Sequence, residues 1–215
     1  MATYDLQEQE QLDALKAWWK QHGNLLINVV TAIAIAFAAW QGWKWYQNRQ
    51  AEKASVVFSL LKQAVQENNT QGIKAFGGEL LNRHPRTIHA SLGALASARM
   101  MIESEDVRTA KIQLLWVANN GRKEIRPLAR LRLAALLLDE KDYEGALKHL
   151  EGKAPSGFEM RFANTRGDIL LAMGKKTEAA NAYREALASA SRPSQSNAIY
   201  REVITQKYDA LGRSN

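Results

Sequence analysis

The chain of 215 residues contains no cysteine, only four prolines and only 13 glycines. The lack of cysteine excludes disulfide scaffolds, thiol nucleophiles, iron–sulfur clusters with cysteine ligands and cysteine-ligated zinc. It does not select a redox compartment, because a cysteine-free chain is compatible with either. Long stretches rich in alanine and leucine, without alternating β-branched residues, predict an all-α protein.

The sequence also lacks a pattern typical of catalysis or metal binding. Of the four histidines, His84 and His89 are five residues apart and have no carboxylate at ligand spacing beside them. The pair Gly77-Gly78 lacks the lysine of a phosphate-binding loop, and the serines lack the glycines of a nucleophile elbow. We therefore expect a protein that is not an enzyme and that needs no cofactor or metal.

The charge is basic but dispersed. The formal net charge is +7 and the sequence pI is about 9.6, which permits attraction to anionic lipid, acidic proteins or nucleic acid. The basic residues after residue 43 are distributed among the expected helices rather than gathered with aromatic residues in one stripe. This distribution is typical of a solvated surface, so no nucleic-acid partner is expected.

One apolar segment is long enough to cross a membrane. Residues 25–43 are dominated by Leu, Ile, Val, Ala and Phe, and as a helix they would extend about 29 Å, close to the thickness of a bilayer core. The pattern predicts an N-terminal segment 1–24, a transmembrane helix 25–43 in contact with lipid, and a domain 44–215. Aromatic residues that partition to the lipid–water interface bracket the span: Trp18, Trp19, Trp40, Trp43, Trp45 and Tyr46.

Two other interpretations of this segment stay open. A cleaved signal peptide has a basic leader, whereas residues 1–24 contain four acidic and two basic side chains, although Ala36-Phe37-Ala38 resembles a cleavage site. A buried core helix is the second alternative, and it is disfavoured by the aromatic residues at both ends of the segment together with helix-forming residues all round the helix. The flanking charges, with Lys16 and Lys20 before the span and lysine and arginine after it, do not decide its orientation.

The domain after the span contains an internal repeat. The segment 167–174, followed by Ala179 and Tyr183, has tetratricopeptide spacing, and a shift of 33 residues places similar residues in register. A loose match is also expected from any alanine-rich array of helical hairpins. We expect a tetratricopeptide-like α-solenoid, in which 47–67 and 71–83 form a degenerate pair and a helix near 194–211 closes the stack. The residues expected to pack the repeats are Ala98, Ala110, Ala134, Tyr143, Ala146, Gly167, Gly174, Ala179 and Tyr183.

The first helix of each tetratricopeptide pair lines a concave groove, and the repeat register predicts which side chains face it. Such an apolar groove accepts either the chain's own terminal helix or an amphipathic helix or extended segment of a partner. The predicted groove residues are Leu92, Leu95, Ile102, Leu128, Leu131, Leu138, Arg161, Asn164 and Asp168.

The whole chain resembles the YfgM family, the ancillary subunits of the SecYEG translocon. The residues that carry the resemblance are the leader 10–19, the span exit 42–46, and the segments 89–96, 131–134 and 166–170. The resemblance implies an inner-membrane protein with a cytoplasmic N-terminus and a periplasmic repeat domain. It also implies association with SecYEG and with the chaperone PpiD, and contact with emerging client polypeptides.

The resulting hypothesis is a non-enzymatic adaptor that the span holds beside the translocon. Two other classes remain open at this stage. One is a repeat scaffold for envelope assembly that does not associate with the translocon. The other is a regulatory or nucleic-acid-binding protein whose basic domain would lie in the cytoplasm.

Overall fold

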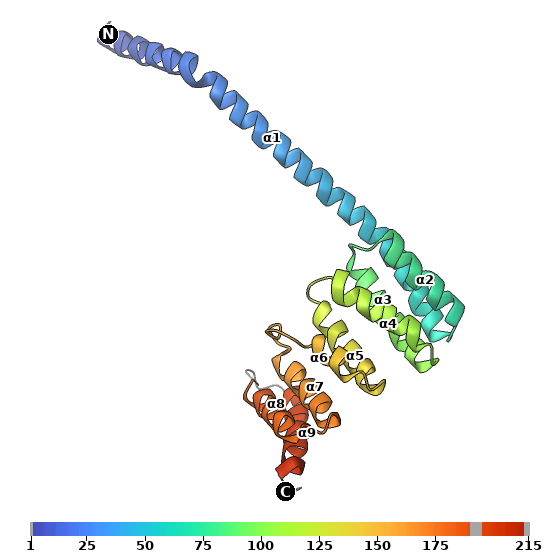
Figure 1. Cartoon of the computed structure of the whole chain (residues 1–215). Helices are drawn as coiled ribbons and strands as arrows, with labels where there is room; N and C mark the ends of the chain where they lie inside the picture. The colour runs from blue at the N-terminus through green and yellow to red at the C-terminus, as the bar shows by residue number, and fades with distance from the viewer. Residues whose placement is uncertain (1, 190–194, 213–215) are drawn as a thin grey trace. The chain divides into compact units, whose positions relative to one another are not determined.

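The computed structural model describes the backbone of residues 2–189 and 195–212, and the side chains of residues 10–189 and 198–212. Every regular element in these ranges is an α-helix, which confirms the expected all-α class (Figure 1). The sequence also predicts a helix break at Arg192-Pro193, and these two positions lie outside the described residues. The helices are α1 (Ala2–Gln66), α2 (Thr70–Arg83), α3 (Ile88–Glu103), α4 (Val107–Asn120), α5 (Arg126–Asp139), α6 (Tyr143–Lys148), α7 (Glu159–Ala172), α8 (Lys176–Ala188) and α9 (Gln195–Gly212).

Helix α1 carries the predicted span. The span and residues 47–66, which the sequence predicts as separate segments, form one uninterrupted helix. The apolar side chains of the span are exposed, with Leu25 at 67% and Ile35 at 65%, and the six bracketing aromatic residues are also exposed. The buried core helix considered above is therefore not what the structure contains. Among the described residues, α1 is the one helix long and apolar enough to cross a membrane.

The chain divides into two compact units, residues 1–50 and 51–215, and the second is the repeat domain. It consists of four helical hairpins: residues 51–66 of α1 with α2, α3 with α4, α5 with α6, and α7 with α8. A residue with left-handed backbone conformation joins the two helices of each hairpin, and these residues follow one another at intervals of 37, 36 and 33 positions. We call them the turn residues: Asn68 (φ 53°), Glu105 (φ 62°), Lys141 (φ 64°) and Gly174 (φ 78°).

The four turns share one hydrogen-bond pattern. In each turn the N–H of the residue after the turn residue donates to the carbonyl five positions back, at 2.8–2.9 Å. The turn residue's own N–H donates to the carbonyl three positions back, at 2.9–3.2 Å. These two bonds satisfy carbonyls that the end of a helix leaves without partners. In the first three turns the next residue also caps the following helix, and these caps are Asn69, Asp106 and Asp142.

The predicted packing residues lie between the helices, as the repeat register requires. Ala98, Ala110, Ala134, Ala146, Ala179 and Tyr183 are at most 1% exposed, Tyr143 is half-buried, and Gly174 is the fourth turn residue. Gly167 lies directly against the Tyr183 ring, where an added Cβ would be 2.5 Å from Cε1. The expected tetratricopeptide-like stacking is thus present in four pairs, including the degenerate first one.

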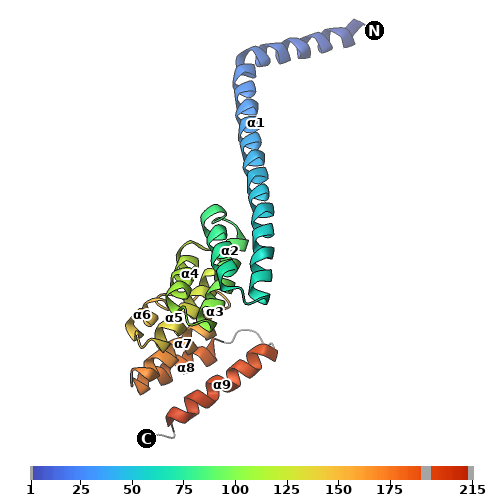
Figure 2. The ribbon, with the colours of Figure 1, turned by 90° about the vertical axis from the view of Figure 1, so that its right-hand side faces the viewer.

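The core continues from hairpin to hairpin. One cluster extends from Ala54 on α1 to Phe162 and Ile169 on α7, and a second joins α7 and α8 to Ile204 on α9. Figure 2 shows α9 beside α7 and α8, at the C-terminal end of the stack. Helix α9 therefore closes the stack, as predicted.

Ion pairs connect successive hairpins at their turns. Lys74 on α2 contacts Asp106 at 2.6 Å, and Lys111 on α4 pairs with Glu140 at the end of α5. Hydrogen bonds from the Lys74 ammonium and from Thr109 lower the pKa of the Asp106 carboxyl to about 2. These contacts fix neighbouring hairpins relative to one another.

Candidate protein-binding face

The predicted groove residues occupy equivalent positions on the first helix of each hairpin. They lie 13, 10, 6 and 3 residues before the turn residue, so they form one strip along each helix. The neighbouring strip, at 14, 11, 7 and 4 residues before the turn, is mostly buried, which places the predicted strip at the flank of the core. We call the strips of the four hairpins together the partner face.

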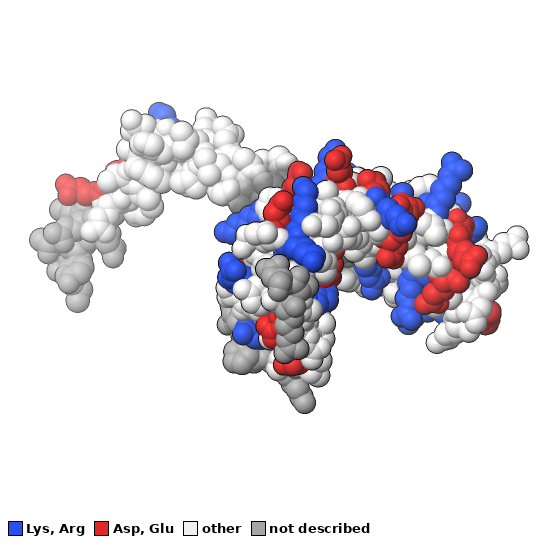
Figure 3. All heavy atoms as spheres, turned by 60° about the horizontal axis from the view of Figure 1, so that its bottom comes forward, with Lys and Arg blue, Asp and Glu red and all other residues white. Residues whose placement is uncertain are grey.

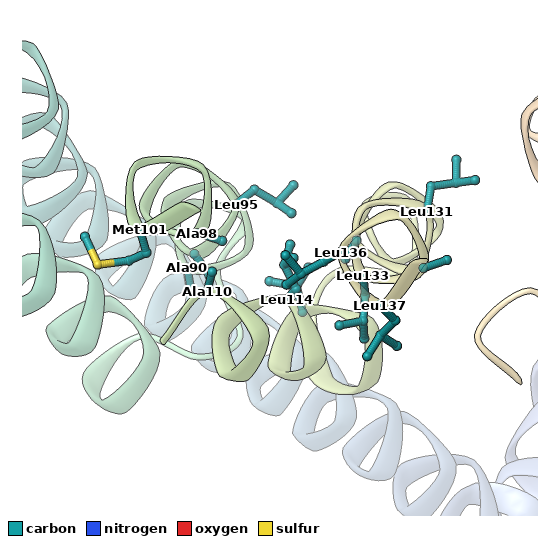
Figure 4. Packing of buried hydrophobic residues seen from close by; sticks show 14 of the residues in the cluster. Ala90, Leu95, Ala98, Met101, Ala110, Leu114, Leu131, Leu133, Leu136 and Leu137 are labelled. Carbon is teal, nitrogen blue, oxygen red and sulfur yellow. The ribbon is translucent and has the colours of Figure 1, made fainter. Parts of the chain in front are cut away.

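The predicted groove leucines differ in their solvent exposure. Leu95 and Leu131 are buried, at 4% and 9% exposed, and Figure 4 shows both pointing to one side of α3 and α5 while Leu137 points to the other. Leu92, Leu128 and Leu138 are half-buried. Ile102 is 41% exposed. Leu95 and Leu131 thus support the face from within, whereas a binding partner would touch Ile102 and the half-buried leucines.

The position three residues before each turn is apolar in all four hairpins. Its occupants are Val65, Ile102, Leu138 and Leu171, and Leu171 is 37% exposed. This row is the part of the partner face that recurs most regularly. It offers a partner one apolar contact per hairpin.

Sequence reasoning missed the first hairpin's share of this face. Phe58 and Val65 occupy the same positions as Leu95 and Ile102, and both pack against the first core cluster. The sequence predicts a helix break at Asn68-Asn69-Thr70, and this break fixes the register of the first hairpin because it lies 37 residues before the Glu105 turn. The alanine pattern used to find the other repeats is absent from this hairpin.

Cationic side chains lie on the partner face and beside it. The Lys62 ammonium lies 5.8 Å from the Phe58 ring centroid, and Arg99 pairs with Glu103 at 2.8 Å. Arg132 donates to the Leu95 carbonyl at 3.4 Å, and burial together with the nearby Arg99 lowers its pKa. Arg161 is exposed. Elsewhere on the repeat domain, charges of both signs are interspersed over the surface that Figure 3 presents.

The last two predicted groove residues hold the chain's own terminal helix. Lys207 on α9 donates to both carboxylate oxygens of Asp168, at 2.7 and 2.9 Å. Asn164 is 5% exposed, and its amide donates to the Tyr200 hydroxyl on α9 at 3.0 Å. We therefore assign Asn164 and Asp168 to the attachment of α9. Of the two occupants considered above, the chain's own helix takes this end.

The same cluster contains two tyrosines. The Tyr183 hydroxyl donates to Asp168 at 2.8 Å, and burial together with this carboxylate raises its pKa. Burial also raises the pKa of Tyr200. Both rings are thus neutral hydrogen-bonding groups at physiological pH, and their role here is structural.

No group of three or more His, Asp or Glu side chains with the spacing of a metal site occurs among the described residues. Of the four histidines, His84 is buried, His89 and His149 are half-buried and His22 is exposed. The His89 ring is tilted against the Phe58 ring, with the two ring centroids 5.5 Å apart. The histidines thus lie apart, on α1, on α3 and at the ends of α2 and α6.

These features define a class of protein: one apolar N-terminal helix joined to a tetratricopeptide-like stack that a C-terminal helix closes. The family profile of the tetratricopeptide repeat-like domain matches residues 16–213. A protein of Neisseria gonorrhoeae named ancillary SecYEG translocon subunit is 30% identical over 96% of this chain and 98% of its own length. Proteins of the same name from Haemophilus influenzae and Escherichia coli are 28% and 25% identical, over 90% and 91% of this chain and 95% of each relative. No solved structure matches the chain. The chain belongs to the YfgM family of ancillary SecYEG translocon subunits.

Proposed function

We propose that this protein is a non-enzymatic adaptor of the Sec translocon, held in the inner membrane by a single span. The observation that carries the proposal is the similarity to translocon subunits along nearly the whole chain, which includes both the apolar helix and the repeat domain. Relatives that shared only the repeats would support a protein-binding role but not this location. The exposure of the apolar side chains in α1 adds independent support for membrane insertion.

In the proposed arrangement the N-terminus lies in the cytoplasm and the repeat domain lies in the periplasm. The domain links SecYEG to a periplasmic chaperone such as PpiD, and it assists the folding or trafficking of translocated polypeptides. Anchoring supplies the mechanism, because two sites held in one membrane meet at a high effective concentration without needing high intrinsic affinity. An envelope-assembly scaffold remains the alternative, and it would not copurify with SecYEG.

The partner face is the proposed contact with chaperone or client. Its regular row of apolar side chains suits an amphipathic helix or an extended segment that places one anchor on each hairpin. Leu95 and Leu131 are poor choices for testing it, because truncating a buried leucine destabilises the fold by about 2–5 kcal/mol. Ile102 and Leu171 are exposed enough to be changed with little effect on folding.

The test compares Ile102→Asp/Leu171→Asp with a matched control, Ile112→Asp/Leu115→Asp. The control residues are 59% and 41% exposed on α4, outside the partner face. Full-length proteins are purified from membranes in mild detergent, and the copurified SecYEG and PpiD are quantified. We expect the first variant to retain SecYEG and to lose most of the PpiD, while the control retains both. Equal PpiD recovery from both variants would reject the partner face, and absence of SecYEG from the unmodified protein would reject the adaptor role.

A further inference from the structure

The two ends of the repeat stack differ in how they are covered. In the second, third and fourth hairpins, the residues 12 and 8 positions before the turn face the preceding hairpin. At position 12 the residues are Gly93, Ala129 and Phe162, and all three are buried. At position 8, Ser97 and Leu133 are buried and Arg166 is half-buried.

The second helix of the preceding hairpin provides the cover. A Cβ added to Gly93 would lie 2.5 Å from Leu80 on α2, and one added to Gly77 on α2 would lie 2.7 Å from the Ser97 hydroxyl. One hairpin later, Leu114 and Val117 on α4 are completely buried and belong to the same cluster as Leu133 (Figure 4). The covering helix therefore presents small or apolar residues three positions apart.

The first hairpin has the same positions without the cover. Its residues at positions 12 and 8 before the turn are Val56 and Leu60, which are 61% and 41% exposed. At the opposite end of the stack α9 covers the last hairpin, and Tyr183, Ala186 and Ile204 are fully buried there. A repeat stack normally ends in a polar outer surface, because an open end exposes residues that evolved to pack. We call Val56 and Leu60 the open end.

We propose that the open end docks an amphipathic helix of a different protein anchored in the same membrane. The small size of the surface argues for an anchored partner, because two side chains are far less than the roughly 800 Å² per partner of a stable interface. Such a contact becomes populated only when both proteins are confined together. Val56 is 13 residues after Trp43, so even an extended chain would keep it within about 45 Å of the predicted span.

The repeat geometry also indicates which kind of helix fits. The helices that cover positions 12 and 8 elsewhere are joined to the next hairpin by short turns, so they run antiparallel to the helix they cover. Two copies of α1 inserted with the same orientation would run parallel. The geometry therefore favours a helix of another protein over the α1 helix of a second copy of this chain.

The experiment places a photo-crosslinking amino acid at Val56 or Leu60 of the full-length protein in native membranes. Control positions are Ser59 and Gln66, which are exposed on the adjacent, solvent-facing side of the same helix, about 80–100° around the helix axis from the middle of the open end. Cross-linked peptides are identified by mass spectrometry. We expect products at 56 and 60, at least fivefold above those at 59 and 66. Their partner residues should lie in a helical segment close to a transmembrane span, with small or apolar residues three positions apart.

A second pair of variants distinguishes loss of docking from misfolding. Val56→Glu should reduce cross-linking from position 60 at least fivefold, whereas Ser59→Glu should not. Both variants should keep the helical circular dichroism of the unmodified protein, because both sites are exposed. Cross-links between two copies of this chain, or to proteins without a membrane anchor, would overturn the proposal, as would equal yields at all four positions. The Ile102→Asp/Leu171→Asp variant should still cross-link from position 60, so failure of the partner face and failure of the open end give different results.

Discussion

Lys207 on α9 and Asp168 on α7, 39 positions apart in the sequence, form an ion pair in which the lysine donates to both carboxylate oxygens. Asp168 also accepts a hydrogen bond from the Tyr183 hydroxyl, and it accepts one from the Asn164 amide at 3.2 Å. The Asp168 carboxylate thus accepts hydrogen bonds from side chains of three helices. This arrangement connects the closing helix to the last hairpin at the end of the partner face.

Removing either member of this pair should weaken the attachment of α9. Lys207→Met should lower the free energy of unfolding by about 1 kcal/mol, since the pair is about one-third exposed and solvent screens it. Asp168→Asn should cost more, about 1–3 kcal/mol, because the buried Tyr183 hydroxyl also loses its charged acceptor. Urea denaturation of the two single variants and the double variant measures the coupling. Lys123→Met, at an exposed lysine, is the control, and strictly additive effects would contradict the coupling.

Two glycines within helices should respond oppositely to alanine. Gly78 on α2 has no atom within 4 Å of an added Cβ, so Gly78→Ala should stabilise the protein by about 0.5–1 kcal/mol through helix propensity. Gly167→Ala should destabilise it by about 1–3 kcal/mol, because the new Cβ would lie 2.5 Å from the Tyr183 ring, which Asp168 holds in place. Thermal unfolding of both variants checks this, and stabilisation by both substitutions would show that the α7–α8 contact is looser than described.

The turn residues predict a reciprocal exchange. Lys141 and Gly174 have nearly the same left-handed conformation, which glycine adopts without steric cost. Lys141→Gly should raise the free energy of unfolding by up to about 1 kcal/mol, and Gly174→Lys should lower it by a similar amount. A lower free energy of unfolding for Lys141→Gly would contradict this explanation, because glycine can make the same backbone hydrogen bonds at a lower steric cost.

Two histidines should make stability fall in mild acid. Burial is the main cause that lowers the pKa of His84 and of His149 below 6.5 in the folded protein. Below pH 6.5 these two histidines bind protons more readily in the unfolded chain than in the folded protein. The free energy of unfolding therefore decreases as the pH falls through this range. Thermal unfolding between about pH 7.5 and pH 5.5 should show a decreasing midpoint. His84→Gln/His149→Gln should flatten this dependence, and an unchanged slope would assign it to other groups.

The helix breaks were predictable because each depends on local chemistry. Asn68-Asn69, Glu105-Asp106 and Gly174-Lys175 supply a turn residue and the residue after it, and three of the four turns also supply a capping side chain. The alanine positions followed from the 33-residue shift between the last two hairpins. The continuity of α1 was missed because the change from apolar to polar residues after the span was taken as a boundary between elements, although the sequence carries no stop signal before residue 66.

The candidate site was predictable in register but not in exposure. Spacing placed Leu95 and Ile102 on one strip, but the burial of Leu95 and the accessibility of Ile102 depend on how the hairpins pack together. The sequence predicts Asn164 and Asp168 as a polar end of the groove and does not reveal their contacts with α9. Their partners Tyr200 and Lys207 are more than 35 positions away in the sequence. Contacts of that range depend on how α9 packs, which periodicity does not encode.

The most direct test of the central claim is protease accessibility of the repeat domain in spheroplasts, with an epitope at the C-terminus. If the repeat domain lies in the periplasm, added protease should remove the epitope from intact spheroplasts and leave a membrane-bound N-terminal fragment that contains the span. An epitope that survives until the inner membrane is lysed would place the repeat domain in the cytoplasm and contradict a periplasmic adaptor.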